Sequence, residues 1–271
     1  MKPRVRFIST ACFLVLLVSV LVQGTFAADR LTVDGAEMWQ QAKARYIDGS
    51  TYVSFRSVLQ ALRPDLRIYW ADGAAWAEGD GLLIRACPGE QWITVNDRVF
   101  YVKGSVAFTG SSVLVPVRVL ARAVGAEVNW DRASGVRVRR GTGVPEAQLY
   151  SEDELYWMSR IISAESRGEP LEGKIAVGTV VLNRAASTEF PNTIYGVIFD
   201  REWGVQFTPV SNGTIYDFPT EESLLAAKLV LDGARAAGDS LYFIAPHLTD
   251  NHWTMEHRTY VTTIGCHWFY R

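Results

Sequence analysis

Cysteine and histidine are scarce in this 271-residue chain, which contains three cysteines and four histidines. One cysteine lies in an apolar N-terminal segment, and the other two, Cys87 and Cys266, are too few and too far apart for a disulfide-stapled scaffold. We expect both to be buried apolar residues, although a bridge between them stays open. Every histidine lies after residue 246, so the first half of the chain has no imidazole to offer a metal.

The four histidines do not form a recognisable metal motif. They are His247, His252, His257 and His267, and no H-E-x-x-H sequence occurs. Intervals of five residues place them on neither one helix face nor one strand face. We therefore expect no metal and no other cofactor, and polar histidines that line a groove. Cys266 beside His267 is a poor nucleophile pair, because neighbours in a strand point to opposite faces.

The chain also lacks an excess of positive charge, with a net charge of −2. Residues 28–141 contain 15 Lys and Arg against 12 Asp and Glu, whereas residues 142–271 contain 9 against 17. Nucleic-acid binding requires a strong basic excess and is excluded as a function. The mild positive charge of residues 28–141 could help the protein adsorb to an anionic surface, and the alternative is that these charges are simply solvated. Gly141–Pro145 has linker composition, so residues 142–151 are predicted to join two domains, 28–141 and 152–271.

Long apolar runs are absent except for Phe7–Val22. Basic residues precede this run, and Thr25 and Ala27 place small residues at the −3 and −1 positions of a cleavage site. We predict a signal peptide over residues 1–27, export of the protein and no stable membrane span after cleavage. A retained membrane anchor is the alternative.

Residues 30–140 contain an internal repeat with an offset of 62. Leu31–Gly35 corresponds to Ile93–Asp97, and Tyr52–Arg56 corresponds to Leu114–Arg118. Each copy is predicted to form a strand, a hairpin turn, a strand, a short helix and a strand. The helices are expected over 55–62 and 117–124.

The doubled "VPVR…L" and "NW" patterns resemble the copper amine oxidase N-terminal-like domain, a small α+β module often attached to exported bacterial enzymes. The second pattern is Tyr69-Trp70 in one copy and Asn129-Trp130 in the other. The resemblance implies an accessory or wall-contacting module, and a plain spacer is the alternative. The family name does not imply copper here.

Helical periodicity dominates the C-terminal half. Helices are predicted over about 151–167, 171–186, 192–199 and 220–236, and strands near 240–244 and 259–269. The overall fold class is therefore α+β, a duplicated small module followed by a mostly helical domain.

Glu165 is the most unusual residue of that half. Leu155, Met158 and Ile162 recur at helical spacing, and Glu165 falls on the same apolar stripe. The helix is predicted to stop at Gly168–Pro170, which leaves Glu165 in its last turn. Burial and the negative end of the helix dipole would both raise its pKa, as general acid catalysis requires. The alternative is a helix-end glutamate that faces solvent or pairs with Arg167 or Arg184.

The ordered segments "AESRGEP…AVGTVVLNR…FPNTI…VIF…QF…LYF…VTTIG" resemble the spore cortex-lytic enzyme (SleB-type) cell wall hydrolase family. The resemblance covers residues 152–271 and implies a lysozyme-like catalytic domain that acts on peptidoglycan. It implies Glu165 as the catalytic glutamate, with Gln206 and Phe207 beside the substrate groove. Ser166 and Trp203 are further candidate substrate-binding residues, with a helix cap as the alternative for Ser166.

The type of reaction depends on whether a second carboxylate lies near Glu165. A hydrolase needs one about 5–5.5 Å or 6.5–9.5 Å away. Glu169 and Glu172 follow the helix break and are expected to face outward. A single acid favours a lytic transglycosylase that forms 1,6-anhydro-muramyl ends by cleaving MurNAc–GlcNAc β-1,4 bonds. The alternatives are a muramidase-type hydrolase and a non-catalytic cell-wall-binding protein.

The resemblance further implies the spore cortex as substrate, a role in germination or sporulation, and location in the cell wall or spore envelope. Peptidoglycan is the expected partner, with an accessory spore or wall protein as a further one. The best-known family members commonly carry a helical peptidoglycan-binding module after the signal, and this chain carries the duplicated module instead. That departure leaves a vegetative-wall substrate open.

Overall fold

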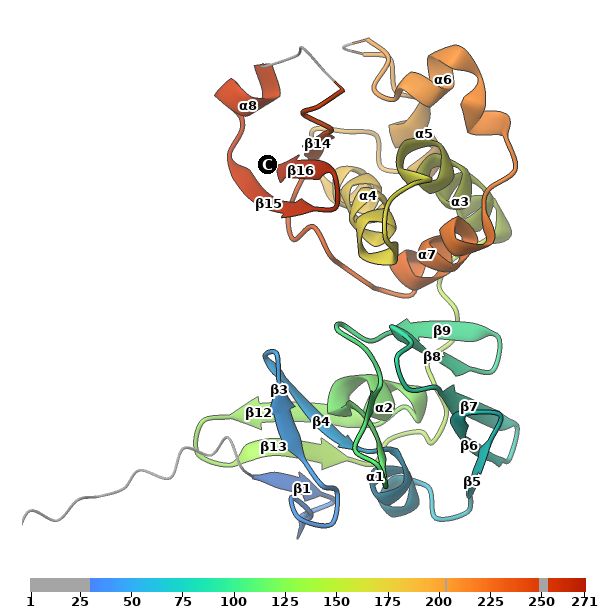
Figure 1. The fold of residues 1–271 in the computed structure, drawn as a ribbon, viewed down its shortest axis with the longest axis vertical. Helices are drawn as coiled ribbons and strands as arrows, with labels where there is room; N and C mark the ends of the chain where they lie inside the picture. The colour runs from blue at the N-terminus through green and yellow to red at the C-terminus, as the bar shows by residue number, and fades with distance from the viewer. Residues whose placement is uncertain (1–29, 203, 249–252) are drawn as a thin grey trace, which may run out of the picture.

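The computed structural model describes residues 30–202, 204–248 and 253–271. It contains a strand-rich N-terminal domain and a mainly helical C-terminal domain, so the α+β prediction is confirmed (Figure 1). The predicted signal peptide lies outside the described residues. Within them, no helix is both long enough and apolar enough to cross a membrane.

The N-terminal domain consists of short strands and two short helices. In chain order they are β1 (Leu31–Val33), β2 (Ala36–Glu37), β3 (Arg45–Ile47), β4 (Ser50–Ser54), α1 (Phe55–Leu62), β5 (Arg67–Ala71), β6 (Ala74–Gly79), β7 (Leu82–Ala86), β8 (Trp92–Val95), β9 (Arg98–Tyr101), β10 (Ala107–Phe108), β11 (Val113–Pro116), α2 (Val117–Ala123), β12 (Glu127–Asp131) and β13 (Gly135–Arg139). The two helices lie where the repeat predicts them.

The central sheet of this domain has the order β10-β11-β4-β3. In its middle, β4 and β11 pair antiparallel with Val53 opposite Val115. These two valines are 62 residues apart, the offset of the sequence repeat. The two copies are therefore related by an approximate two-fold axis that passes between Val53 and Val115.

The two flanking sheets are not equivalent, because one of them has an extra strand. One has the order β12-β13-β1-β2, in which β1 pairs parallel with β13. The other has the order β5-β6-β7-β8-β9, so β7 lies between the strands that correspond to β13 and β1. The repeat did not predict β7, because this strand lies between the two copies in the sequence.

The C-terminal domain contains a helical bundle and one small sheet. Its elements are α3 (Glu152–Ser166), α4 (Leu171–Ala186), α5 (Ile194–Phe199), α6 (Thr208–Asn212), the 3₁₀ helix η2 (Thr214–Tyr216), α7 (Glu221–Leu231), β14 (Tyr242–Ile244), α8 (Trp253–His257), β15 (Tyr260–Ile264) and β16 (His267–Tyr270). The sheet has the order β14-β16-β15.

Two predicted boundaries in this domain are wrong. The helix predicted over 220–236 ends at Leu231, where Asp232 is the C-cap and Gly233 adopts a φ of +96°. The strand predicted over 259–269 is the β15–β16 hairpin, because the chain turns at Gly265 with a φ of +57°. Both errors concern turns inside apolar stretches, where periodicity gives little warning.

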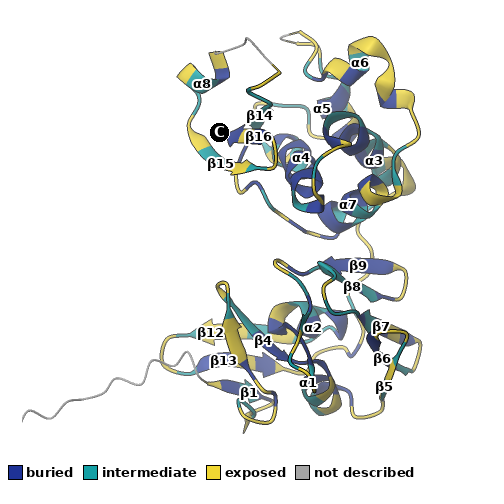
Figure 2. Ribbon diagram, viewed as in Figure 1, coloured by how far each residue is buried: buried dark blue, intermediate teal, exposed yellow. Residues whose placement is uncertain are grey.

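Helices α3, α4 and α7 pack tightly, and their buried residues meet in the middle of the bundle (Figure 2). Gly178 on α4 allows this approach, since a Cβ there would lie 2.8 Å from Ile162 of α3 and 2.9 Å from Val230 of α7. The small sheet packs on α4 through the buried ring of Phe269. This arrangement holds the C-terminal end of α3 beside the sheet.

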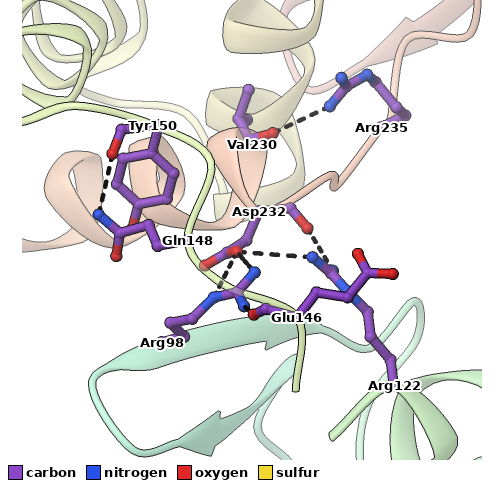
Figure 3. A network of polar contacts seen from close by, with 8 residues as sticks. All are labelled: Arg98, Arg122, Glu146, Gln148, Tyr150, Val230, Asp232 and Arg235. Atoms are coloured by element: carbon purple, nitrogen blue, oxygen red, sulfur yellow. Dashed lines mark hydrogen bonds and ion pairs between the residues drawn. The ribbon is translucent and has the colours of Figure 1, made fainter. Parts of the chain in front are cut away.

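The two domains share a packed interface. The β8–β9 hairpin places Trp92, Val99 and Tyr101 against the core of the helical bundle. Beside this apolar contact, Arg98 and Arg122 of the N-terminal domain reach Asp232 at the end of α7 (Figure 3).

Candidate active site

Helix α3 positions Glu165. It starts with a capping box in which Ser151 and Glu154 satisfy each other's backbone N–H groups, and its last helical residue is Ser166. Glu165 lies in the last turn, as predicted, and is partly buried. Burial raises the pKa of its carboxyl to about 7, and the nearby charge of Arg184 opposes the shift. Its carboxylate forms no ion pair with any described residue.

Glu165 faces a cleft of about 540 Å³ between the bundle and the small sheet. The cleft is lined by Ala164, Glu165, Arg184, Gln206, Phe207, Thr208, Pro209, Asn212, Thr214, Phe243, Ile244, Ala245, Leu248 and His267. Glu165 is the only carboxylate among these lining residues. A carboxyl that is protonated half the time near neutral pH can give a proton to a ligand in this cleft and take one back.

Arg184 forms the floor of the cleft from the last turn of α4. Its guanidinium lies over the rings of Phe190, Phe207 and Tyr242 at 4.8, 5.2 and 5.4 Å from their centroids. It also donates to the carbonyl of Leu241 at 2.7 Å. Burial lowers the pKa of Arg184 to about 10, which leaves it charged at neutral pH. Burial of Glu165 nonetheless outweighs this neighbouring charge.

Gln206 and Phe207 lie in the cleft wall, beside Glu165. The Gln206 side-chain oxygen accepts from Arg184 at 3.4 Å, and the Phe207 ring packs 6.4 Å from that of Phe243. Trp203 lies outside the described residues. Of the five candidate site residues, Glu165, Gln206 and Phe207 thus line the same cleft.

Ser166 does not line the cleft. Its hydroxyl is buried and donates to the carbonyl of Ile162, one turn back in α3. The side chain thus satisfies the helix end and is absent from the cleft lining. This geometry corresponds to the structural alternative for Ser166 and offers no hydroxyl to a ligand.

The expectation that Glu169 faces outward is wrong. Its side chain is only 10% exposed, and one oxygen accepts from the Cys266 N–H at 2.9 Å. Its other oxygen lies 3.9 Å from Nδ1 of His267. The turn after α3 folds Glu169 back against the β15–β16 hairpin, while Glu172 lies near Tyr101 of the other domain.

His267, at the start of β16, lies in the cleft wall, where the histidines were expected to line a groove. Burial lowers the pKa of its imidazole, and Glu169 opposes that shift. The ring lies edge-on to Phe243 at 5.3 Å. Glu169 and His267 are 98 residues apart, so no local pattern predicts their proximity, although Glu169 lies within the segment "AESRGEP" and His267 lies two residues after "VTTIG".

The two cysteines are free, so they form no bridge with each other. Cys266 is exposed at the hairpin turn and Cys87 is partly exposed. The expectation of two buried cysteines is therefore wrong.

Comparison with known families matches each domain separately. The Cell Wall Hydrolase family matches residues 168–270, which include Gln206, Phe207 and His267 and begin just after Glu165. Most of the C-terminal domain thus matches this family. The Copper amine oxidase N-terminal domain family matches residues 32–138. Both resemblances expected from the sequence are confirmed.

Similar curated proteins are spore cortex-lytic enzymes. That of Bacillus cereus is 38% identical over 130 residues, which are 48% of each chain. That of Bacillus subtilis is 33% identical over 120 residues, 44% of this chain and 38% of the relative. This cell wall hydrolase domain thus spans about half the length, or less, of these relatives.

A solved structure of similar sequence is the catalytic domain of the germination-specific lytic transglycosylase SleB from Bacillus anthracis. It is 35% identical, and the match covers 46% of this chain and all of that one, with a TM-score of 0.42.

Proposed function

We propose that this protein cleaves the MurNAc–GlcNAc β-1,4 bonds of peptidoglycan glycan strands, with the spore cortex as substrate and Glu165 as the catalytic acid. The observation that carries the proposal is a carboxyl with a pKa of about 7 in an open cleft, in a domain of the cell wall hydrolase family. The similarity to spore cortex-lytic enzymes of Bacillus supports the same substrate class.

The reaction we propose is that of a lytic transglycosylase. Glu165 protonates the glycosidic oxygen as the bond from that oxygen to C1 of MurNAc breaks. The same carboxylate then accepts the proton of the C6 hydroxyl, whose oxygen forms a new bond to C1 and closes a 1,6-anhydro ring. No water is consumed, and Glu165 ends in its starting protonation state.

The composition of the cleft supports this reaction over hydrolysis. A hydrolase needs a second carboxylate as nucleophile or base. Among the described residues that line the cleft, Glu165 is the only acid. Glu169, the nearest in sequence, accepts from the Cys266 N–H and is not among the residues that line the cleft. A muramidase-type hydrolase remains the alternative for the same site.

Product analysis tests the proposal. The mature protein and Glu165→Gln are incubated with purified cortex and with vegetative peptidoglycan, and the released muropeptides are analysed by mass spectrometry. We expect anhydro-muramyl products, each lacking one water, and none from the variant. In H₂¹⁸O a hydrolase would instead label the reducing ends, and absence of products on both walls would leave only the non-catalytic wall-binding alternative.

We also propose that residues 1–27 direct export to the cell wall or spore envelope. The expected result is a mature N-terminus at residue 28, found by N-terminal sequencing of the secreted protein. An accessory spore or wall protein as further partner would appear as a specific cross-linked species on intact spores.

A further inference from the structure

The N-terminal domain has two grooves, one beside each outer hairpin of its central sheet, and the repeat relates them to each other. One, of about 520 Å³, lies between α1, β5 and the β10–β11 hairpin. The other, of about 360 Å³, lies between α2, β12 and the β3–β4 hairpin. Each residue that lines the smaller groove has its repeat counterpart in the lining of the larger one. The duplication has therefore produced two equivalent concave sites.

Each groove presents two exposed aromatic rings. Trp70 and Phe108 line the larger groove, with ring centroids 5.9 Å apart, and the counterparts Trp130 and Tyr46 line the smaller one. All four side chains are at least half exposed. The two copies have diverged at most positions, yet both retain tryptophan at this place. Rings kept at the surface of a groove are available to a ligand rather than to the core.

Each groove also contains an arginine at the start of its helix. These are Arg56 on α1 and Arg118 on α2, both exposed and 62 residues apart. Among the described residues neither has a carboxylate partner, and Arg118 donates only to the carbonyl of Val128 at 3.4 Å. Several other arginines of the domain are paired with acids: Arg67 with Glu78, Arg85 with Glu90, and Arg137 with Asp131. The grooves therefore hold uncompensated positive charge.

We propose that the two grooves are binding sites for peptidoglycan glycan strands, and this inference rests on the proposed function of the C-terminal domain. Aromatic rings stack on the apolar faces of pyranose rings, with little loss of side-chain freedom. A guanidinium binds carboxylates, which the stem peptides of peptidoglycan supply. Ser50 and Ser112, equivalent by the repeat, add a hydroxyl to each groove.

The duplication itself favours a polymeric ligand. A glycan strand repeats the same disaccharide along its length, so it can offer the same chemical group to both grooves. Two weak sites on one polymer bind far more tightly together than either does alone. The N-terminal domain would in this way hold the catalytic cleft against an insoluble wall.

Sedimentation with purified, insoluble peptidoglycan tests the proposal, using the full mature chain with Glu165→Gln so that the wall is not degraded. In this background we expect Trp70→Ala or Trp130→Ala alone to weaken binding several-fold. The double substitution should weaken it on the order of a hundredfold, because the losses at two linked sites multiply. Leu83→Ala, an exposed residue of β7 outside both grooves, is the matched control and should bind like its parent. Circular dichroism checks the fold of each variant.

The arginines give an independent readout. Arg56→Gln with Arg118→Gln should weaken binding at low salt and flatten its dependence on salt concentration, since two charge contacts are removed. The proposal is overturned if the double tryptophan variant sediments like its parent, which would assign the grooves to another class of ligand such as a protein. It is equally overturned if Leu83→Ala weakens binding as much as the tryptophan substitutions do.

Activity separates this inference from the proposed function. With Glu165 intact, the ratio of cleavage of insoluble wall to cleavage of soluble glycan oligomers should fall at least tenfold in the double tryptophan variant. If the parent enzyme cleaves neither substrate, the proposed function fails, whereas the sedimentation result still decides whether the grooves bind glycan.

Discussion

Arg98 on the β8–β9 hairpin donates two hydrogen bonds to one carboxylate oxygen of Asp232, 134 residues away at the end of α7. The Asp232 side chain is 1% exposed, and Arg122 lies 3.6 Å from the same oxygen. Arg122 also donates to the Asp232 backbone carbonyl, and Arg98 to that of Glu146 in the connecting segment (Figure 3). A buried anion between two cations thus joins the two domains.

We predict that Asp232→Asn uncouples the domains. It leaves the buried Arg98 and the partly exposed Arg122 without their counter-ion, which costs about 3 kcal/mol. Calorimetry should show two unfolding transitions in place of one, and proteolysis within 142–151 should accelerate. Asp239→Asn, which removes an exposed ion pair with Arg271, is the control and should leave the stability close to the parental value. A single transition at the parental temperature in Asp232→Asn would contradict the prediction.

Activity should decline as the pH rises through about 7. The acid form of Glu165 is the reactive one, and its pKa is raised to about 7 by burial. Above that pH the protonated fraction falls about tenfold per pH unit. Initial rates of glycan release between pH 5 and pH 9 measure the decline. A rate that stays flat up to pH 9 would exclude Glu165 as the acid of the rate-limiting step.

The same carboxyl should make stability depend on pH. A pKa raised on folding gives stability that is full below about 4.5, the unfolded value, and is lost as the pH rises through about 7. Glu165→Gln has no such dependence at this position. The gain in free energy of unfolding from the substitution should therefore be larger at pH 8 than at pH 5 by about 2 kcal/mol. Urea denaturation at the two pH values measures it, and an equal gain at both would refute the burial argument.

Arg184→Met should move the pH profile toward higher pH. The positive charge of Arg184 opposes the raised pKa of Glu165, so its removal raises that pKa further. The midpoint of the pH–rate curve is the readout, because it does not depend on the maximal rate. Arg184→Lys keeps a positive charge and should leave the midpoint closer to the parental one. A midpoint that moves to lower pH in Arg184→Met would argue against the electrostatic coupling.

Gly265→Ala should disturb the wall of the cleft. A Cβ at this position would lie 1.8 Å from Oε2 of Glu169, so the Glu169 carboxylate must leave the Cys266 N–H and move away from His267. Gly238→Ala is the matched control: it has the same φ of +57°, but its Cβ would lie 3.7 Å from Val261. Both substitutions carry a backbone cost of about 1 kcal/mol. Only Gly265→Ala should lose further stability and cleavage activity, and equal effects in the two variants would show that the Glu169 contact is unimportant.

The sequence by itself determined the features that depend on neighbouring residues. The spacing of Met158, Ile162 and Glu165 placed the glutamate on the apolar side of α3, because helix geometry repeats every 3.6 residues. The offset of 62 predicted two equivalent units, since turn and strand signals recur locally in each copy.

Only the tertiary structure decided which distant residues meet. Glu169 lies inward because a hairpin about a hundred residues later offers it the N–H of Cys266. Helix α7 ends at Leu231, five residues before the predicted end, and Asp232 at its C-cap contacts two arginines of the other domain through its carboxylate. The pairing of Val53 with Val115 joins the two copies in one sheet and so places an aromatic groove beside each of its outer hairpins. Such contacts depend on packing between segments far apart in the chain, and local periodicity carries no information about that choice of partner.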